Sequence, residues 1–231
     1  MDQPAPYGGV ANLEVMEAAR NYNDFLLHTI CAYAPAAGVI IDFGAGTGTY
    51  ARRLAAMKRF VICVEADPAL RARLAREGLS VCERLDELAV GSADYIYSLN
   101  VLEHIADDLA ALRQLRSRLR VGGRLLIYVP AFPCLFSSMD RAVGHFRRYR
   151  RRQLIDLASA AGLELSEARY CDSLGFAASL AFKALGQRDG TINGTALVAY
   201  DRLFFPLSRA LDRFCGRAFG KNLMLVARRP R

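Results

Sequence analysis

The spacing of apolar residues along the chain changes repeatedly between that of a helix and that of a strand. Apolar residues on one helical face predict helices over 13–34, 50–56, 68–77 and 107–120. Short apolar runs, several of them β-branched, predict strands over 39–43, 60–64, 79–82, 94–98 and 124–129. Short strands that alternate with helices are typical of a parallel sheet covered by helices on both faces.

The last third of the chain is rich in long apolar stretches. Residues 163–168 and 222–229 are predicted to be strands. Between them, residues 173–186 and 196–219 have helical spacing. Four arginines are interspersed in the second stretch: Arg202, Arg209, Arg213 and Arg217. We expect these helices to form ordinary core or dimer packing, an apolar lid over a ligand, or a face for a membrane surface.

Composition agrees with a packed protein. The chain has 231 residues, of which 53% are hydrophobic and 23% charged, so it falls within the range of one domain or one domain with an appendage. Its six cysteines are spread singly, without a C-x-x-C pair or histidines at metal-ligand spacing. We therefore expect neither a zinc or other metal site nor a disulfide framework, and reduced thiols in a cytoplasmic protein.

Positive charge is concentrated in the second half. Residues 1–120 hold 13 Lys and Arg against 15 Asp and Glu, and residues 121–231 hold 18 against 8, so the halves contribute −2 and +10 to the net charge of +8. An anionic partner should meet the second half.

No segment has the pattern of a signal peptide or a membrane span. The start of the chain lacks a basic region followed by an apolar one, and the longest stretch without a formal charge, 25–41, is interrupted by Pro35 and Gly38. We expect a cytoplasmic location, with peripheral membrane contact as an alternative.

The segment IIDFGAGTGTYARRL, residues 40–54, places three glycines in five positions between a predicted strand and a predicted helix. Gly44, Gly46 and Gly48 allow a tight turn and a close approach of a ligand to the backbone. The spacing matches neither the dinucleotide pattern G-x-G-x-x-G nor a P-loop. Asp42 would repel a pyrophosphate, but it could hold the cationic amino group of an amino acid, directly or through water.

Glu65 ends the second predicted strand, 21 residues beyond Gly44. A carboxylate at such a position can accept both hydroxyls of a ribose, whether the ligand is NAD or another adenosine derivative. Glu65 alone therefore leaves an NAD-dependent oxidoreductase open.

Together with SLNVLEHI at 98–105, these features resemble the class I S-adenosylmethionine-dependent methyltransferases over residues 36–130. The resemblance implies that S-adenosylmethionine is held by Tyr22, Asp42, Gly44, Ala45, Gly46, Gly48, Glu65, Ala66, Leu85, Asp86 and Asn100. One departure is Arg84, which stands where relatives often have an acid, next to the expected adenine contacts. His104, at the start of a helix, is expected to have a structural or capping role.

The resemblance also implies a fold. We expect a single α/β domain over 1–231 with a Rossmann-like, seven-stranded, mostly parallel sheet whose last strands form an antiparallel hairpin. Residues 36–130 would form the cofactor-binding core. Residues 131–155 and 170–220 would form substrate-side cap elements, the second of them a helical cap inserted before the last strand.

The segment 130–154 follows the fifth predicted strand and contains six arginines and His145 between positions 141 and 152, with no acid among them. It resembles the GHxRRY segment of a subgroup of small-molecule and lipid methyltransferases. The resemblance implies His145 as the catalytic base, because a histidine titrates near neutral pH. It implies substrate contacts for a further group: Asp140, Arg147, Arg148 and Tyr149. A solvated basic loop and a nucleic-acid contact remain alternatives.

The expected reaction is methyl transfer to a small-molecule or lipid-like acceptor, anionic, lipophilic or both, at a hydroxyl or other nucleophilic atom. An RNA methyltransferase ranks second, because Asn100 is followed by Val-Leu-Glu rather than by an N-P-P-Y-like motif. A non-catalytic cofactor-binding protein also remains open, as does a homodimer.

Overall fold

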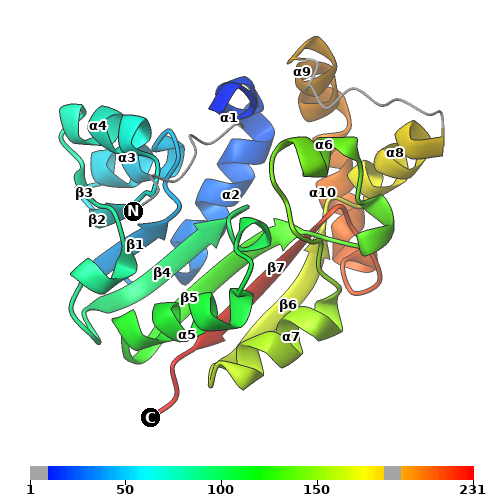
Figure 1. Cartoon of the computed structure of the whole chain (residues 1–231). Coiled ribbons are helices and arrows are strands. Elements are labelled where there is room, and N and C mark those ends of the chain that lie inside the picture. Colours follow the sequence, from blue (N-terminus) through cyan, green and yellow to red (C-terminus); the bar gives the residue numbers. More distant parts are fainter. Residues whose placement is uncertain (1–9, 185–193) are drawn as a thin grey trace.

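The computed structural model describes residues 10–184 and 194–231 and contains the predicted sheet (Figure 1). The strands are β1 (Val39–Phe43), β2 (Phe60–Val64), β3 (Ser80–Cys82), β4 (Ala93–Leu99), β5 (Leu119–Pro130), β6 (Glu164–Cys171) and β7 (Asn222–Arg228). They form one seven-stranded sheet in the order β3-β2-β1-β4-β5-β7-β6. Strands β1 to β5 pair in parallel, and β7 lies antiparallel between β5 and β6. The predicted Rossmann-like fold is confirmed.

Helices lie on both faces of the sheet. They are α1 (Val10–Glu17), α2 (Arg20–Tyr33), α3 (Thr49–Ala56), α4 (Pro68–Arg76), α5 (Asp108–Arg118), α6 (Ser138–Ala142), α7 (Arg151–Ala160), α8 (Ser173–Ala184), α9 (Gly194–Leu203) and α10 (Phe205–Cys215). Three short 3₁₀ helices follow strand ends: η1 (Leu85–Glu87), η2 (Leu102–His104) and η3 (Pro133–Leu135). None of these helices, within the two described ranges, is long and apolar enough to span a membrane.

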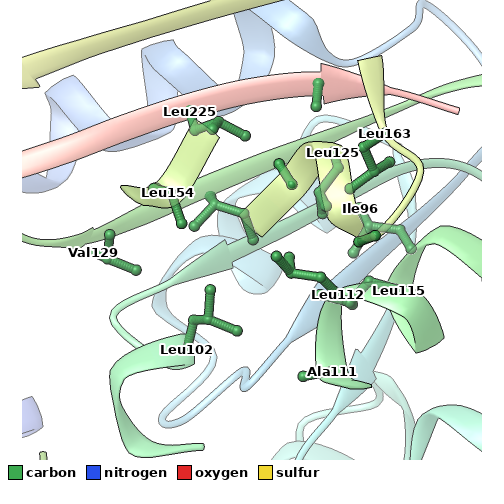
Figure 2. Packing of buried hydrophobic residues seen from close by; sticks show 14 of the residues in the cluster. Ile96, Leu102, Ala111, Leu112, Leu115, Leu125, Val129, Leu154, Leu163 and Leu225 are labelled. Carbon is green, nitrogen blue, oxygen red and sulfur yellow. The ribbon is translucent and has the colours of Figure 1, made fainter. Parts of the chain in front are cut away.

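The strands divide their side chains between two apolar cores. Along β5, Leu125, Ile127 and Val129 point toward α5 and α7, whereas Leu126 and Tyr128 point toward α2, α3 and α10. Figure 2 shows the first of these cores. Because both faces of a central strand are covered, its sequence is continuously apolar, and each fully buried leucine contributes about 1.5–3 kcal/mol.

Two predicted boundaries were wrong. The helix expected over 13–34 is two helices, because the Asn23 side-chain amide donates to the carbonyl oxygen of Met16 (2.9 Å) and caps the end of α1. The helix expected to continue to residue 120 ends at Arg118, because Leu119 already pairs with Ala93 in the sheet. The glycines at 122 and 123 lie inside β5.

The predicted insertion before the last strand consists of α8, α9 and α10, which lie beyond the carboxyl ends of the central strands (Figure 1). Residues 185–193 of this expected cap lie outside the described residues. Two buried aspartates fasten the insertion to the rest of the protein. Asp212 accepts hydrogen bonds from the amides of Asp172 (2.7 Å) and Ser173 (2.9 Å), where α8 begins.

Asp201 of α9 supplies the N-terminal cap that the sequence of α2 lacks. Its carboxylate, 2% exposed, accepts from the backbone amides of Asn21 (2.9 Å) and Tyr22 (2.8 Å), and no residue next to α2 provides a side-chain cap. The first amides of a helix have no partner within the helix, and the positive end of the helix dipole favours an anion there. A residue 180 positions away therefore completes the helix.

We expect Asp201→Ala to lower the free energy of unfolding by about 1–3 kcal/mol, because two amides at the start of α2 lose a charged, buried acceptor. Urea denaturation followed by circular dichroism measures this change. The matched control is Asp24→Ala on the same helix, which removes an exposed ion pair with Arg53 and should cost less than about 1 kcal/mol. Equal losses for the two variants would contradict the capping role.

Candidate functional site

The direction in which the chain adds strands to the sheet reverses between β1 and β4, and a large cavity lies at this point. From β1 the chain continues through β2 and β3 on one side, and then returns to add β4 on the other side. Ligands of such sheets bind outside the carboxyl ends of the strands at this point. A cavity of about 2290 Å³ lies there, bordered by the segments that follow β1, β2, β4 and β5 and by α8, α9 and α10. It has a glycine-loop end, around Asp42 and Glu65, and a His145 end, around Glu103 and His145.

The glycine loop is folded back against the second strand. The amides of Gly44 (2.8 Å) and Ala45 (3.2 Å) both donate to the carbonyl oxygen of Val64. Gly44 has φ +78°, and a Cβ there would lie 2.3 Å from Val101. Gly46 has φ +55°, and a Cβ on it would meet only Leu13, at 3.4 Å. The loop therefore presents bare backbone to the cavity.

Glu65 fixes the loop from the end of β2. Its carboxylate accepts from the amides of Gly46 (2.7 Å) and Asp67 (2.9 Å), and the residue is 8% exposed. Each carboxylate oxygen has two acceptor positions, so these two bonds leave capacity for further donors. Because Glu65 also lines the cavity, that capacity is available to a ligand.

Asp42 is a buried carboxylate with an unsatisfied oxygen. It lies at the end of β1 and lines the cavity, although it is only 4% exposed, and its Oδ2 has no hydrogen-bond partner. Burial raises the pKa of Asp42 to about 7, the neighbouring Tyr97 hydroxyl opposes the rise, and the nearby Glu65 carboxylate adds to it. A cationic ligand group beside Oδ2 would donate a hydrogen bond to this oxygen. Its positive charge would also favour the ionised form of the Asp42 carboxyl.

The remaining residues predicted at this end lie around the same cavity. Tyr22 and Asn100 face each other from α2 and from the end of β4, and Asn100 adopts φ +54°. Gly48, with φ +81°, is the N-cap of α3, and it packs on Leu74 behind the loop rather than lining the cavity. The other predicted cavity-lining residues are Ala45, Ala66, Leu85 and Asp86.

Asp86 is engaged by Arg84, the residue that departs from the family pattern. Arg84 Nη2 lies 2.7 Å from Asp86 Oδ2, and both side chains are exposed. Arg84 is therefore paired with the acid two positions further along the chain, Asp86.

At the His145 end, Asp140 organises the segment between α6 and α7. Asp140 is 1% exposed and accepts from Ser137, from His145 Nδ1 (2.7 Å) and from both Nε (2.8 Å) and Nη2 (2.9 Å) of Arg148. Burial alone would raise the pKa of Asp140, but the hydrogen bonds from His145 and Arg148 hold it well below its usual range. Asp140 thus orients His145 and Arg148, which both line the cavity.

Two of the residues predicted to contact the substrate, Arg147 and Tyr149, are not among those that line the cavity. Tyr149 is fully buried, and its hydroxyl donates to Asp108 Oδ2 (2.9 Å), so it anchors the segment in the core. Arg147 also turns away from the cavity and pairs with Asp108 (2.6 Å) and with the carbonyl of Ala106 (2.7 Å). Neither spacing nor residue type distinguishes Arg147 from Arg148, because the buried Asp108 that Arg147 contacts comes from α5.

Sequence analysis did not name two groups of cavity residues, although it expected the insertion that supplies the second group as a substrate-side cap. The first is Glu103, which is fully buried yet lines the cavity next to His104 and His145. The sequence signal for Glu103 was its position next to His104, directly after the fourth strand. Residues that follow parallel strands meet at the same edge of the sheet. Burial raises the pKa of Glu103 to about 8, and burial together with the charge of His145 lowers that of His104 to about 4. The second group is apolar and comes from the insertion: Leu174, Leu197, Phe204 and Phe205.

Comparisons with known proteins give one matching family model and several solved structures with the same fold. A family model described as a methyltransferase domain matches residues 16–168. No curated protein sequence matches the chain. The putative methyltransferase of Haloferax volcanii, solved in complex with the Trm112 methyltransferase activator, has 16% identity and a TM-score of 0.66, with 96% of each chain covered.

Two further solved structures have the same fold. A possible histamine N-methyltransferase of Thermotoga maritima has 16% identity and a TM-score of 0.64, with 95% of this chain and 94% of that chain covered. The geranyl diphosphate C-methyltransferase of Streptomyces coelicolor has 14% identity and a TM-score of 0.60, with 89% and 80% covered. At these identities the likeness shows the shared fold.

We expect Asp42→Asn to stabilise the ligand-free protein at pH 8 by roughly 2–4 kcal/mol. A carboxyl with a raised pKa holds its proton in the folded state, so its destabilising effect grows as the pH rises from about 4 to 7 and is complete above it. The advantage of the variant should therefore vanish near pH 4. Denaturation at pH 4, 6 and 8 measures it. Asp24→Asn, on the exposed face of α2, is the control and should show no such trend.

Proposed function

The chain belongs to the methyltransferase domain family, and from that premise we propose that it transfers a methyl group from S-adenosylmethionine to a small, lipid-like acceptor with an anionic group. The observation that carries this proposal is the glycine-loop end of the cavity, where bare backbone and two nearly buried carboxylates surround one space. We further propose that residues 144–149 place the chain in the subgroup with a GHxRRY segment.

The residues at the glycine-loop end fit S-adenosylmethionine. The unsatisfied Oδ2 of Asp42 suits the ammonium group of a methionine part. A Cβ on Gly46 would meet only Leu13, so the loop leaves room for a ligand there, and Glu65 keeps acceptor capacity for ribose hydroxyls. Tyr22 and Asn100 border the same space from the opposite side. The turn at Leu85 and Asp86 also lines the cavity, with Leu85 buried and Asp86 exposed, and would then flank the adenine.

When bound, S-adenosylmethionine supplies an electrophilic methyl group. The protein then has to hold the acceptor in line with the methyl group and to exclude water. We assign His145 the task of accepting the acceptor's proton, with its Nδ1 fixed by Asp140 at 2.7 Å so that Nε2 faces the cavity. Arg148, held by the same carboxylate, would position an anionic group of the acceptor.

A further part of the cavity lining is apolar and comes with a basic side chain, Lys183. The insertion contributes Leu174, Leu197, Phe204 and Phe205 to its lining. Lys183 lines it too, and donates to the carbonyl of Cys134 (2.6 Å). An acceptor with a hydrophobic body and an acidic group complements this combination.

The protein surface around α10 also combines apolar and basic side chains. A stripe of apolar side chains is exposed from the end of α9 along α10, with Phe214 at 86%, and its members are Leu203, Phe204, Leu207, Leu211 and Phe214. Exposed arginines accompany the stripe: Arg202, Arg213 and Arg217. The acids within 194–220, Asp201 and Asp212, are both buried. An apolar stripe beside cations suits the surface of an anionic bilayer, from which a lipid-like acceptor would be taken.

We expect the protein to bind S-adenosylhomocysteine in isothermal calorimetry, and Gly46→Arg and Glu65→Ala each to weaken binding at least about tenfold. The first substitution fills the ligand space at a left-handed backbone position, and the second removes the acceptor for the ribose. Gly78→Arg is the matched control, because Gly78 has φ +78° and a Cβ there meets nothing within 4 Å.

Preferential binding of NADH would contradict this proposal and would favour an oxidoreductase. Catalysis itself is tested by incubation with labelled S-adenosylmethionine and with metabolite, lipid and RNA extracts. Label in the lipid fraction supports the proposed acceptor class, and label in RNA alone overturns it.

We expect the protein to co-sediment with vesicles of anionic phosphatidylglycerol and not with vesicles of phosphatidylcholine alone. Phe214→Glu should weaken this binding about tenfold or more, because it removes the most exposed ring of the stripe and adds a negative charge. Phe60→Glu is the control, since Phe60 is also exposed, at 56%, but lies at the opposite ends of the strands.

Two results would overturn the proposed surface. Salt-sensitive binding to RNA, without binding to vesicles, would assign the arginines to a nucleic acid. A stable dimer that dissociates in Phe214→Glu, without vesicle binding, would assign the stripe to an interface between two copies.

A further inference from the structure

Three potential metal ligands from two distant parts of the sequence meet at the His145 end of the cavity. Glu103, His104 and His145 each offer one ligand atom, and these atoms lie within 4.8 Å of one another. His145 Nε2 lies 3.8 Å from Glu103 Oε1, and the two imidazole rings meet edge to face with centroids 4.5 Å apart. All three residues line the cavity, so a group bound between them would be open to a ligand.

The Glu103 carboxylate is the strongest sign that something is bound there. The residue is fully buried, and neither carboxylate oxygen has a hydrogen-bond partner. A buried carboxylate without donors or a counter-ion is costly, and proteins usually pair such a group or coordinate a metal with it. The Glu103 backbone carbonyl accepts from Phe146 (2.8 Å), and this bond brings His145 to the carboxylate.

The groups that contact the two histidines are of the kind that usually orient metal-bound histidines. His145 Nδ1 contacts Asp140 Oδ1 at 2.7 Å, which leaves Nε2 directed toward Glu103. His104 interacts with the backbone of Val143 and Gly144. Metal-bound histidines usually direct their second ring nitrogen to a carboxylate or a backbone carbonyl, which fixes the tautomer and the ring orientation.

The local charges also favour a cation. Arg148 is the nearby positive side chain, but Asp140 accepts two of its nitrogens and balances its charge. The carboxylate of Glu103, once ionised, then has only His145 Nε2, at 3.8 Å, beside it. An ion with two positive charges would balance it and leave one positive charge facing the cavity.

We propose that Glu103, His104 and His145 bind a divalent transition-metal ion of the Zn²⁺ type. Two imidazole nitrogens and one carboxylate oxygen are ligands that Zn²⁺ accepts, whereas Mg²⁺ and Ca²⁺ prefer oxygen alone. Ligand atoms about 2.1 Å from a tetrahedral ion lie about 3.4 Å from one another, so atoms of this group that are up to 4.8 Å apart have to approach by about 1.4 Å. The cavity side would remain open for a fourth ligand.

The ion would bind an oxygen of the acceptor, and this part of the inference rests on the proposed function. A hydroxyl bound to a divalent ion loses its proton more readily, and a carboxylate or phosphate oxygen is held in place by it. His145 would then be a metal ligand instead of the proton acceptor assigned above. Binding of the ion itself depends only on the three side chains.

The test is a titration of the full chain, freed of metal with a chelator, with Zn²⁺ in competition with a chromophoric chelator. We use Cys134→Ser as the background, because Cys134 is an exposed thiol that could bind zinc. We expect one equivalent of Zn²⁺ to bind at least 100-fold more tightly than Mg²⁺. Glu103→Gln and His104→Asn should each weaken Zn²⁺ binding at least tenfold.

His28→Ala is the matched control, since this exposed histidine on α2 bonds only to its own helix and should leave Zn²⁺ binding unchanged. Circular dichroism shows whether each variant is folded. Absence of Zn²⁺ binding by the unsubstituted site, or equal binding by that site and Glu103→Gln, would overturn the inference.

The two proposals fail separately. If S-adenosylhomocysteine binds but Zn²⁺ does not, the metal site is wrong and the methyltransferase proposal stands. If Zn²⁺ binds at the three residues but S-adenosylhomocysteine does not, the metal site stands and the cofactor assignment fails.

Discussion

Strand β1 pairs in parallel with both β2 and β4, and the whole site depends on this central position. After β1 the chain adds β2 and β3 on one side of this strand, and then β4 on its other side. The segments that follow β1 and β4 therefore diverge, and the cavity lies between them. Asp42 and the glycine loop come from one side of that division, and Asn100 and Glu103 from the other. The antiparallel β7 then lets the α8–α10 insertion return over the same edge.

The glycine-loop end was predictable because its features are local. Glycines with a left-handed backbone, an acid at the end of β1 and another just after β2 are read directly from short segments, since strand ends are marked by apolar runs. The order and direction of the strands followed from the same alternation. Tyr22 was placed only by resemblance, because its position depends on α2 being held against Tyr128 and Phe205.

The His145 end was predicted only in part, because its geometry depends on partners far away in the sequence. Residues 141–152 contain no acid, and which arginine faces the cavity is decided by the nearby Asp140 and by Asp108 of α5. Glu103 is 42 positions from His145, and only the fold brings them together. The apolar lining from the insertion has the same helical spacing as ordinary core. Sequence periodicity therefore does not separate the two.

The bond between Asp201 and the start of α2 also bears on how the protein is made. Contacts between residues far apart in sequence cost more loop-closure entropy and form later than local ones. During synthesis, α2 and the glycine loop leave the ribosome long before α9, so the amides of Asn21 and Tyr22 stay without their carboxylate until most of the chain has emerged. The start of α2 thus acquires its cap only when α9 arrives, and a chain truncated before α9 would leave these two amides without it.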